Sequence, residues 1–180
     1  MEVVVSAHFD IARPVMSIQI DKENLSGIVD NFAGVFTSYQ ASRKLGTKVY
    51  LTNYEELEYD GAESVAKTLE KDTLVIVVDT TTDAEEKDAY IGNVYGFTTE
   101  KLKEKFAEKI LFKEGFYEEK EDETWIYGKK YGFKTFYFGV PIPHDYHDIN
   151  NKISLSAIDK ASQVLEDLIK WLHNNIDSAK

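Results

Sequence analysis

The sequence predicts an α/β fold, a three-layer α/β/α sandwich around a mixed, largely parallel sheet. Two observations carry this prediction. Strand-like apolar runs alternate along the chain with stretches in which apolar residues recur at helical spacing. In addition, the run at 73–78 (TLVIVV) is continuous and rich in β-branched residues, which is typical of a strand buried on both faces in the middle of a parallel sheet.

The first half of the chain contains three predicted strands and two predicted helices. Apolar residues recur every three or four positions between residues 28 and 45, and Gly46 follows them, as expected of a helix C-cap. Pro14 and the polar residues of 11–24 predict a loop. The predicted elements are a strand at 3–6, a helix at 28–45, a strand at 48–52, a helix at 61–70 and the buried strand at 73–78.

The second half continues the alternation. Thr98 or Thr99 would cap one helix, and Ser154 or Ser156 would cap the last one. The charge run 118–123 (EEKEDE) predicts a solvated loop or the start of a helix. The predicted elements are a strand at 89–95, a helix from 98 or 99 to about 112, a strand at 134–140 and a final helix with apolar residues at 158, 161, 164, 165, 168, 169 and 172.

Composition bounds the classes of protein to which the chain can belong. Its 180 residues suit one domain, 1–180. A formal net charge of −11 argues against nucleic acid as a partner, because phosphate binding needs clustered lysine and arginine. No apolar run approaches the length of a membrane span, no signal peptide is visible, and there is no cysteine. We therefore expect a cytoplasmic protein without a membrane partner.

Acidic and histidine side chains recur where the predicted strands end or where the first long helix begins. Ligands of open α/β sheets bind outside the carboxyl ends of the strands, so one edge of the sheet would collect these side chains. The residues concerned are His8, Asp30, Glu55, Glu56, Asp79 and His147.

These residue types suit a centre of two divalent ions. Imidazole and carboxylate are the usual ligands of catalytic zinc, and two ions need a shared carboxylate, for which Asp30 is the natural candidate. Each ion would then have one histidine and one further carboxylate. Glu55 is placed as the general base, and Asp10 as the hydrogen-bond partner that fixes the tautomer of His8.

At this point the sequence resembles a known family. The motifs that carry the resemblance are His8-Phe9-Asp10, Asp30-Asn31-Phe32-Ala33-Gly34, Glu55-Glu56, Asp79 and Tyr146-His147, in that order. They are similar to those of the two-zinc aminopeptidases and related carboxypeptidase-like hydrolases, including leucyl aminopeptidases, glutaminyl cyclase relatives and tetrahedral aminopeptidases. The resemblance covers roughly residues 3–172.

The resemblance implies roles for the motif residues. His8 and Asp79 would bind one zinc, Glu56 and His147 the other, and Asp30 would bridge them. Glu55 would be the general base and acid in the hydrolysis of a small peptide or amide, and a cis peptide would follow Asp30. The ions are expected to be Zn²⁺, with Co²⁺ or Mn²⁺ as alternatives.

Other features leave alternatives open. His144 competes with His147 for the last ligand position, and the pattern around Tyr146 favours His147. No insertion between Asp79 and Lys134 is long enough for a lid domain, so we expect a minimal version of the fold. The rival functions are a catalytically inactive metal- or peptide-binding module and an N-acyl amino acid deacylase.

Overall fold

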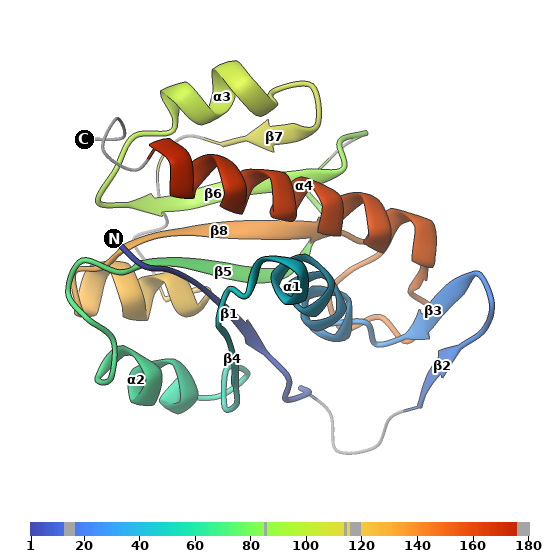
Figure 1. Ribbon diagram of the computed structural model, residues 1–180. Coiled ribbons are helices and arrows are strands. Elements are labelled where there is room, and N and C mark those ends of the chain that lie inside the picture. Colours follow the sequence, from blue (N-terminus) through green and yellow to red (C-terminus); the bar gives the residue numbers. More distant parts are fainter. Residues whose placement is uncertain (13–16, 85, 114, 116–119, 176–180) are drawn as a thin grey trace.

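A mixed six-stranded sheet forms the centre of the molecule (Figure 1). The computed structural model describes residues 1–12, 17–84, 86–113, 115 and 120–175. All neighbouring strands run parallel except β6 and β8. The strands lie in the order β4 (Val49–Thr52), β1 (Val3–His8), β5 (Leu74–Thr81), β8 (Lys134–Pro141), β6 (Ala89–Tyr95) and β7 (Ile110–Phe112). The predicted mixed, largely parallel sheet is confirmed.

Helices cover both faces of this sheet. Helices α1 (Phe32–Leu45) and α4 (Leu155–Asn175) pack on one face, and the opposite face is covered by α2 (Asp60–Ala66) and the π-helix η1 (Trp125–Lys130). Helix α3 (Glu100–Phe106) lies beside β7 at one edge. The three layers follow from the alternation of strands and helices along the chain.

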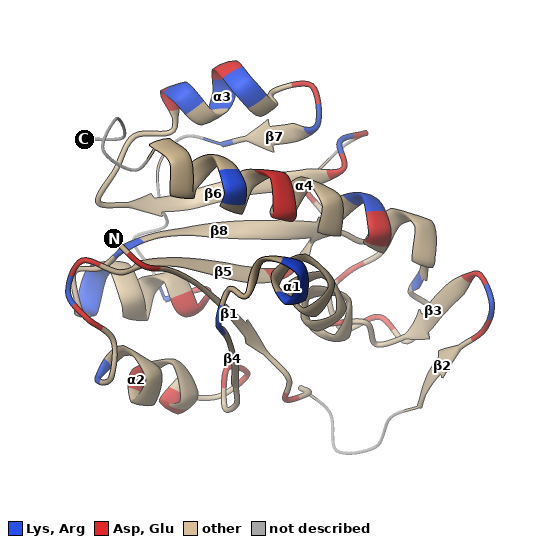
Figure 2. Ribbon diagram, viewed as in Figure 1, with Lys and Arg blue, Asp and Glu red and all other residues tan. Residues whose placement is uncertain are grey.

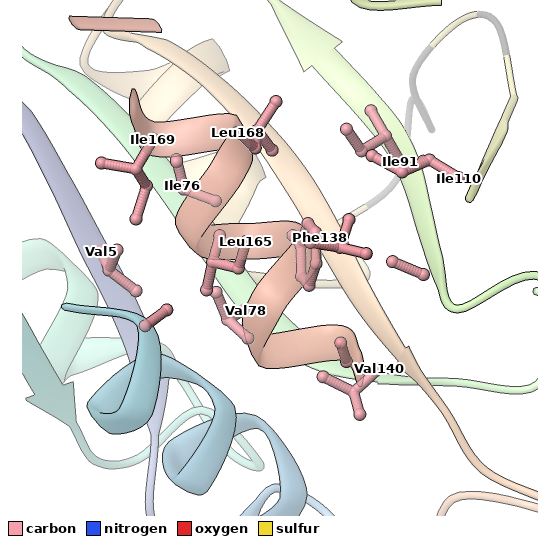
Figure 3. Packing of buried hydrophobic residues seen from close by; sticks show 14 of the residues in the cluster. Val5, Ile76, Val78, Ile91, Ile110, Phe138, Val140, Leu165, Leu168 and Ile169 are labelled. Atoms are coloured by element: carbon pink, nitrogen blue, oxygen red, sulfur yellow. The ribbon is translucent and has the colours of Figure 1, made fainter. Parts of the chain in front are cut away.

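The larger core lies between the sheet and α4 (Figure 3). Leu165, Leu168 and Ile169 form part of the apolar stripe of α4 and pack against strand residues that include Ile76 and Phe138. Full burial of each such side chain stabilises the fold by about 1.5–3 kcal/mol. The helix begins where predicted, because the Ser154 Oγ accepts the Ala157 N–H at 3.0 Å.

The predicted loop at 11–24 is wrong in its last part. Residues 13–16 lie outside the described part of the chain, but β2 (Ile18–Ile20) and β3 (Asn24–Gly27) form a small antiparallel sheet with β9 (Lys152–Ser154). These strands are short and partly exposed, so they carry no clear apolar alternation. Their pairing joins segments far apart in sequence, which local patterns do not reveal.

The helix predicted from 98 or 99 to 112 is also shorter. Thr99 is its N-cap residue, but α3 ends at Phe106 and the chain then forms β7. Residues Ile110–Phe112 pair with Ala89–Ile91 at the sheet edge. Backbone hydrogen bonding to a neighbouring strand thus overrides the local helical pattern. Other boundaries differ as well: α1 begins at Phe32 rather than at 28, and α2 ends at Ala66 rather than at 70. The predicted end of α1 at Leu45, with Gly46 as its C-cap, is confirmed.

The charge run was predicted to be a solvated loop or the start of a helix. Its end does begin the helical segment that leads into η1, but this end is not solvated. Glu118 and Glu119 lie outside the described residues, whereas Asp122 and Glu123 are buried, at 6% and 1% exposure. Elsewhere, charged residues occur mainly on helices and loops, with few on the central strands (Figure 2). Among the described residues, no helix has both the length and the apolar character that a membrane span requires.

Candidate metal centre

The side-chain alternation of two neighbouring strands places His8 and Asp79 on one face of the sheet. Val4 of β1 and Val77 of β5 both pack in the core beneath η1 and α2. The strands are parallel and Ser6 pairs with Val77. Two residues further along each strand stand His8 and Asp79, which share this face because successive side chains alternate. His8 is the last residue of β1, and Asp79 follows the apolar run of β5 directly, two residues before that strand ends.

A tight turn after β4 carries Glu55 and Glu56. The Tyr54 carbonyl accepts the backbone N–H groups of Glu58 and Tyr59 at 3.0 and 2.7 Å. Tyr54 and Tyr59 both have positive φ, at 61° and 62°, a conformation that non-glycine residues rarely adopt. The turn therefore holds two adjacent carboxylates at the carboxyl edge of the sheet.

Asp30 reaches the same edge from the segment before α1. The peptide between Asp30 and Asn31 is cis, as expected. The Asn31 Nδ2 donates to the Val78 carbonyl at 2.7 Å, which ties this segment to the end of β5. The Asn31 side chain fills the space where a Cβ on residue 34 would lie, so the glycine at this position lets α1 pack over it.

His8 lies at the middle of the resulting cluster. Its Nε2 is 3.3 Å from Asp30 Oδ1, 3.4 Å from Asp79 Oδ1 and 3.9 Å from Glu55 Oε2. Its other ring nitrogen, Nδ1, is 3.5 Å from Asp10 Oδ1. The imidazole is only 2% exposed. One nitrogen thus faces the carboxylate cluster, while the second faces a separate carboxylate behind the ring.

A second histidine meets Asp30 from the other side. The His147 Nε2 is 3.6 Å from Asp30 Oδ2 and 3.3 Å from Glu56 Oε2. The two oxygens of Asp30 therefore face different histidines, Oδ1 toward His8 and Oδ2 toward His147. This is the arrangement that a carboxylate shared by two cations requires.

The competing histidine lies elsewhere in the same segment. The side chain of His144 is exposed, and its backbone amide donates to the Asn151 Oδ1 at 3.1 Å. The contacts of His147 with Asp30 and Glu56 make it the better placed of the two for the last ligand position.

Burial and mutual repulsion perturb the acids of the cluster. Burial, followed by the charge of Asp79, raises the pKa of Glu55 to about 9, and burial together with the charge of Asp30 raises the pKa of Asp79 to about 7. Burial opposes the charging of His8, but Asp79 and its other carboxylate neighbours raise the pKa of His8 well above its ordinary value. The carboxylates of the cluster therefore carry more negative charge than the positively charged side chains within the cluster can balance.

Asp10 behaves differently from these acids. Burial again disfavours its charge, but the contacts with His8 and with the Glu55 and Glu56 backbone amides outweigh it and lower the pKa of Asp10. The Glu55 N–H donates to the Asp10 Oδ1 at 3.3 Å. Asp10 thus links the ring of His8 to the turn after β4 as a stable carboxylate.

The donor set fits divalent cations. Asp30 Oδ1 and Glu56 Oε1 are buried and accept no hydrogen bond within the described residues. Two sets of three ligand atoms, each set within 4.8 Å, occur in the cluster: His8, Glu55 and Asp79, and His8, Asp30 and Glu56. Buried oxygens without donors, converging with imidazole, are suited to zinc or a similar ion.

The centre opens into a cleft of about 620 Å³. Much of its lining is not apparent from the sequence, because the aromatic residues resemble core positions and the acids resemble a solvated run. The missed residues include Tyr59, Tyr90, Asn93, Lys120, Glu121, Asp122 and Tyr137. The charge run at 118–123 was the one sequence feature that pointed to this part of the lining, and the sequence did not reveal that the end of the run is buried.

Comparison with known proteins finds similarity at the level of the fold. No family model matches the sequence, and no match was found among curated proteins. Among solved structures, the Pyrococcus horikoshii TET1 peptidase, which can assemble into a tetrahedron or a large octahedral shell, superposes with a TM-score of 0.59 at 18% identity. That alignment covers 85% of this chain and 52% of the peptidase chain.

Two further archaeal enzymes are similar. The aminopeptidase APDkam598 of Desulfurococcus kamchatkensis gives a TM-score of 0.58 at 16% identity, over 84% of this chain and 50% of that one. A TET aminopeptidase of the Thaumarchaeota archaeon SCGC AB-539-E09 gives 0.56 at 18% identity, over 86% and 51%. The chain thus spans about half the length of these enzymes, and it shares with them a peptidase-like α/β fold.

Proposed function

We propose that this protein is a metal-dependent aminopeptidase with a dinuclear zinc centre. The observation that carries the proposal is the position of Asp30, whose two carboxylate oxygens face two different histidines within 3.6 Å. A carboxylate so placed can serve two ions at once. The aminopeptidase-like fold supports the same reaction class.

The ligands divide into two sets around Asp30. His8 and Asp79 would hold one ion, and Glu56 and His147 the other, with one oxygen of Asp30 for each. When bound, the ions would supply Lewis-acid chemistry that polarises a carbonyl and acidifies water. Imidazole and carboxylate ligands favour Zn²⁺, and Co²⁺ and Mn²⁺ accept the same set.

Glu55 is the proposed general base and acid. Its Oε2 lies farther from the His8 Nε2 than the nearest oxygens of Asp30 and Asp79 do, at 3.9 Å against 3.3 and 3.4 Å, and it lines the cleft. It would accept a proton from the attacking water and donate one to the leaving amine. Its raised pKa suits a group that must both take and release a proton.

Asp10 is the proposed positioning residue for His8. Its carboxylate faces the Nδ1 of that ring, so it would fix the tautomer with Nε2 free to act as a ligand. Its low pKa keeps it ionised in this role.

The test is turnover of amino-acid anilides by protein loaded with Zn²⁺, Co²⁺ or Mn²⁺. We expect the Glu55→Gln variant to lose at least about 100-fold in kcat while retaining its metal, because general acid–base catalysis contributes roughly 10²–10⁴-fold. The control is Asp60→Asn, an exposed acid at the start of α2 that does not line the described cleft, and it should retain activity. Full activity in Glu55→Gln would refute the mechanism.

The same assays separate the rival functions. Stoichiometric metal binding without turnover of any peptide would identify a binding module instead. Hydrolysis of N-acyl amino acids in preference to substrates with a free amino terminus would identify a deacylase. Each result is measurable with the same metal-loaded preparation.

A further inference from the structure

One wall of the cleft is not explained by the candidate metal centre. The cleft of about 620 Å³ extends from the centre to side chains of β6, of β8 and of the segment before η1. None of these side chains belongs to the proposed ligand set. They include the aromatic rings of Tyr90 and Tyr137 together with Asn93 and Asp122. The ring of Tyr59, the N-cap residue of α2, also lines the cleft.

Asp122 presents a fixed carboxylate on this wall. Its Oδ1 accepts the Thr124 backbone N–H at 2.6 Å and also the Thr124 hydroxyl, and its Oδ2 accepts the Asn93 side-chain amide. The residue is 6% exposed yet lines the cleft. Three donors hold the carboxylate in one orientation, which preorganises it for a ligand.

The charge on Asp122 is not fully balanced. Burial raises the pKa of Asp122 in spite of the donors from Thr124 and Asn93. A cationic ligand would stabilise such a buried carboxylate more than a neutral one, because a charge-assisted hydrogen bond is stronger than one from a neutral donor.

The rest of the cleft lining is also acidic. Two divalent ions would balance the four carboxylates that line the cleft at the proposed centre. The other acids that line it are Glu58, Asp83, Glu121 and Asp122, against the single lysine Lys120. Of these, Asp83 also pairs with Lys113, at 3.7 Å. The described part of the lining therefore favours a cationic ligand.

Lys120 provides an independent observation, because its own ammonium group is bound beside this wall. The Lys120 Nζ lies 4.4 Å from the centroid of the Tyr59 ring and donates to the Glu58 carbonyl at 3.1 Å. An aromatic face and an oxygen acceptor thus already hold an alkylammonium here. Lys120 is exposed, so its charge is largely screened by water.

We propose that this wall selects substrates whose N-terminal residue has a basic side chain, with Asp122 as the residue that binds the side-chain cation. The inference rests on the proposed function, because it names the substrate class of the same cleft. A lysine or arginine side chain would place its charge against the Asp122 carboxylate and its methylenes along the tyrosine rings.

The first test compares substrates that differ only by the charged group. Lysyl and norleucyl anilides form one pair, and arginyl and citrullinyl anilides form another. We expect kcat/KM to favour the basic member by roughly tenfold or more, as for a hydrogen bond to a charged group. The preference should decrease as salt is added. Equal rates or a preference for the neutral member would overturn the proposal.

Variants then assign the preference to Asp122. Asp122→Asn keeps the size and one acceptor oxygen, and it should lower the lysyl-to-norleucyl ratio about tenfold. The control Glu121→Gln removes the same charge from an exposed neighbour in the same cleft, and it should change the ratio less than about twofold. An equal effect in both variants would contradict a specific site at Asp122.

Asp122 is buried, so its variant can fail to fold, and a second variant guards against this. Lys120→Met removes the one lysine of the described cleft lining from an exposed position. It should raise the lysyl-to-norleucyl ratio about twofold or more, because a competing positive charge is lost. A fall in the ratio would contradict the proposal.

Binding measurements keep this inference separate from the proposed function. Calorimetry of the Zn²⁺-loaded protein with lysinamide and with norleucinamide compares affinities without any turnover. Tighter binding of lysinamide, by about tenfold, supports the inference even if no anilide is hydrolysed, a result that would refute only the aminopeptidase activity. Hydrolysis accompanied by equal affinities would refute only the selectivity.

Discussion

Single residues at the candidate centre are arranged around one buried imidazole and an excess of carboxylates. His8 is within 4 Å of acids from four different segments of the chain. Burial, and after it the repulsion between neighbouring acids, raises the pKa values of Glu55 and Asp79 in the absence of cations. The site is thus electrostatically costly for the fold and favourable for a bound cation.

This cost predicts a pH dependence of the metal-free protein. The folded-state pKa of Glu55, about 9, exceeds its ordinary value, so the folded state binds the proton more tightly than the unfolded state. The stabilisation is therefore complete at low pH and is lost as the pH rises toward 9. With a chelator present, urea unfolding should show a decreasing free energy of unfolding from pH 5 to pH 9.

The Glu55→Gln variant is the control for this pH dependence. It removes the titrating group, so the decrease should become smaller, and excess Zn²⁺ should also reduce it in the unaltered protein. A free energy of unfolding that rises with pH over this range would contradict the expected electrostatics.

Replacement of the proposed ligands should affect the two proposed ions differently. Asp30→Asn weakens the residue that faces both histidines, so we expect fewer than one ion per chain by metal analysis. His147→Ala should leave close to one ion, since His8 and Asp79 remain. His144→Ala is the matched control and should retain two. Loss of metal in His144→Ala but not in His147→Ala would reverse the assignment.

At the scale of single elements, the turn after β4 shows how local packing fixes the site. A Cβ at residue 61 would lie 2.5 Å from both the backbone nitrogen and the backbone oxygen of Asn53. The glycine therefore permits the close approach of α2 to the turn that carries Glu55 and Glu56. The Gly61 N–H also donates to the Asn53 carbonyl at 3.1 Å.

We expect Gly61→Ala to displace this turn. The added methyl group should lower the free energy of unfolding by about 1–3 kcal/mol, as for other overpacked sites, and should weaken metal binding through Glu56. Chemical denaturation and metal titration measure the two effects. Ser64→Ala, on the exposed side of α2, should change stability by less than about 0.5 kcal/mol, and an equal loss in both variants would argue against the close contact as the cause.

Strong periodicity made some elements predictable, and weak periodicity concealed others. The strand predicted at 89–95 matches β6, and the run at 73–78 lies within β5. The strands β2, β3, β7 and β9 have only three or four residues each and depend on distant partners. Their pairing energy is not encoded in a local window, so sequence patterns missed them.

At the scale of the whole molecule, the site lies at the edge of a sheet that is packed on both faces by helical layers. The apolar stripe of α4 covers one face of the sheet, and η1 and α2 cover the face toward which His8 and Asp79 point. Stability of the core and geometry of the centre are therefore linked, because the same strands serve both.

Truncation of the α4 core should reveal this link. Leu165→Ala removes a fully buried side chain, so we expect the free energy of unfolding to fall by about 2–5 kcal/mol, with metal stoichiometry unchanged in the folded protein. Lys160→Ala, on the exposed face of the same helix, should have an effect below about 0.5 kcal/mol. A fall of less than 1 kcal/mol for Leu165→Ala would contradict the packing in Figure 3.

The sequence by itself determined the fold class and a short list of chemically capable residues. Periodicity is a local property, and it predicted the alternation of buried strands with helices. The position of polar residues at the ends of those strands predicted that His8 and Asp79 approach each other, since parallel strands bring their carboxyl ends to one edge.

Only the tertiary structure decided what surrounds those residues. In the folded chain the two oxygens of Asp30 face different histidines, and His147 rather than His144 contacts Asp30 and Glu56. Asp122 is buried in the wall of the cleft. Each outcome depends on contacts between segments far apart in the chain. A residue type and its local neighbours fix its chemistry, but the dielectric environment and the partners that tune that chemistry come from packing.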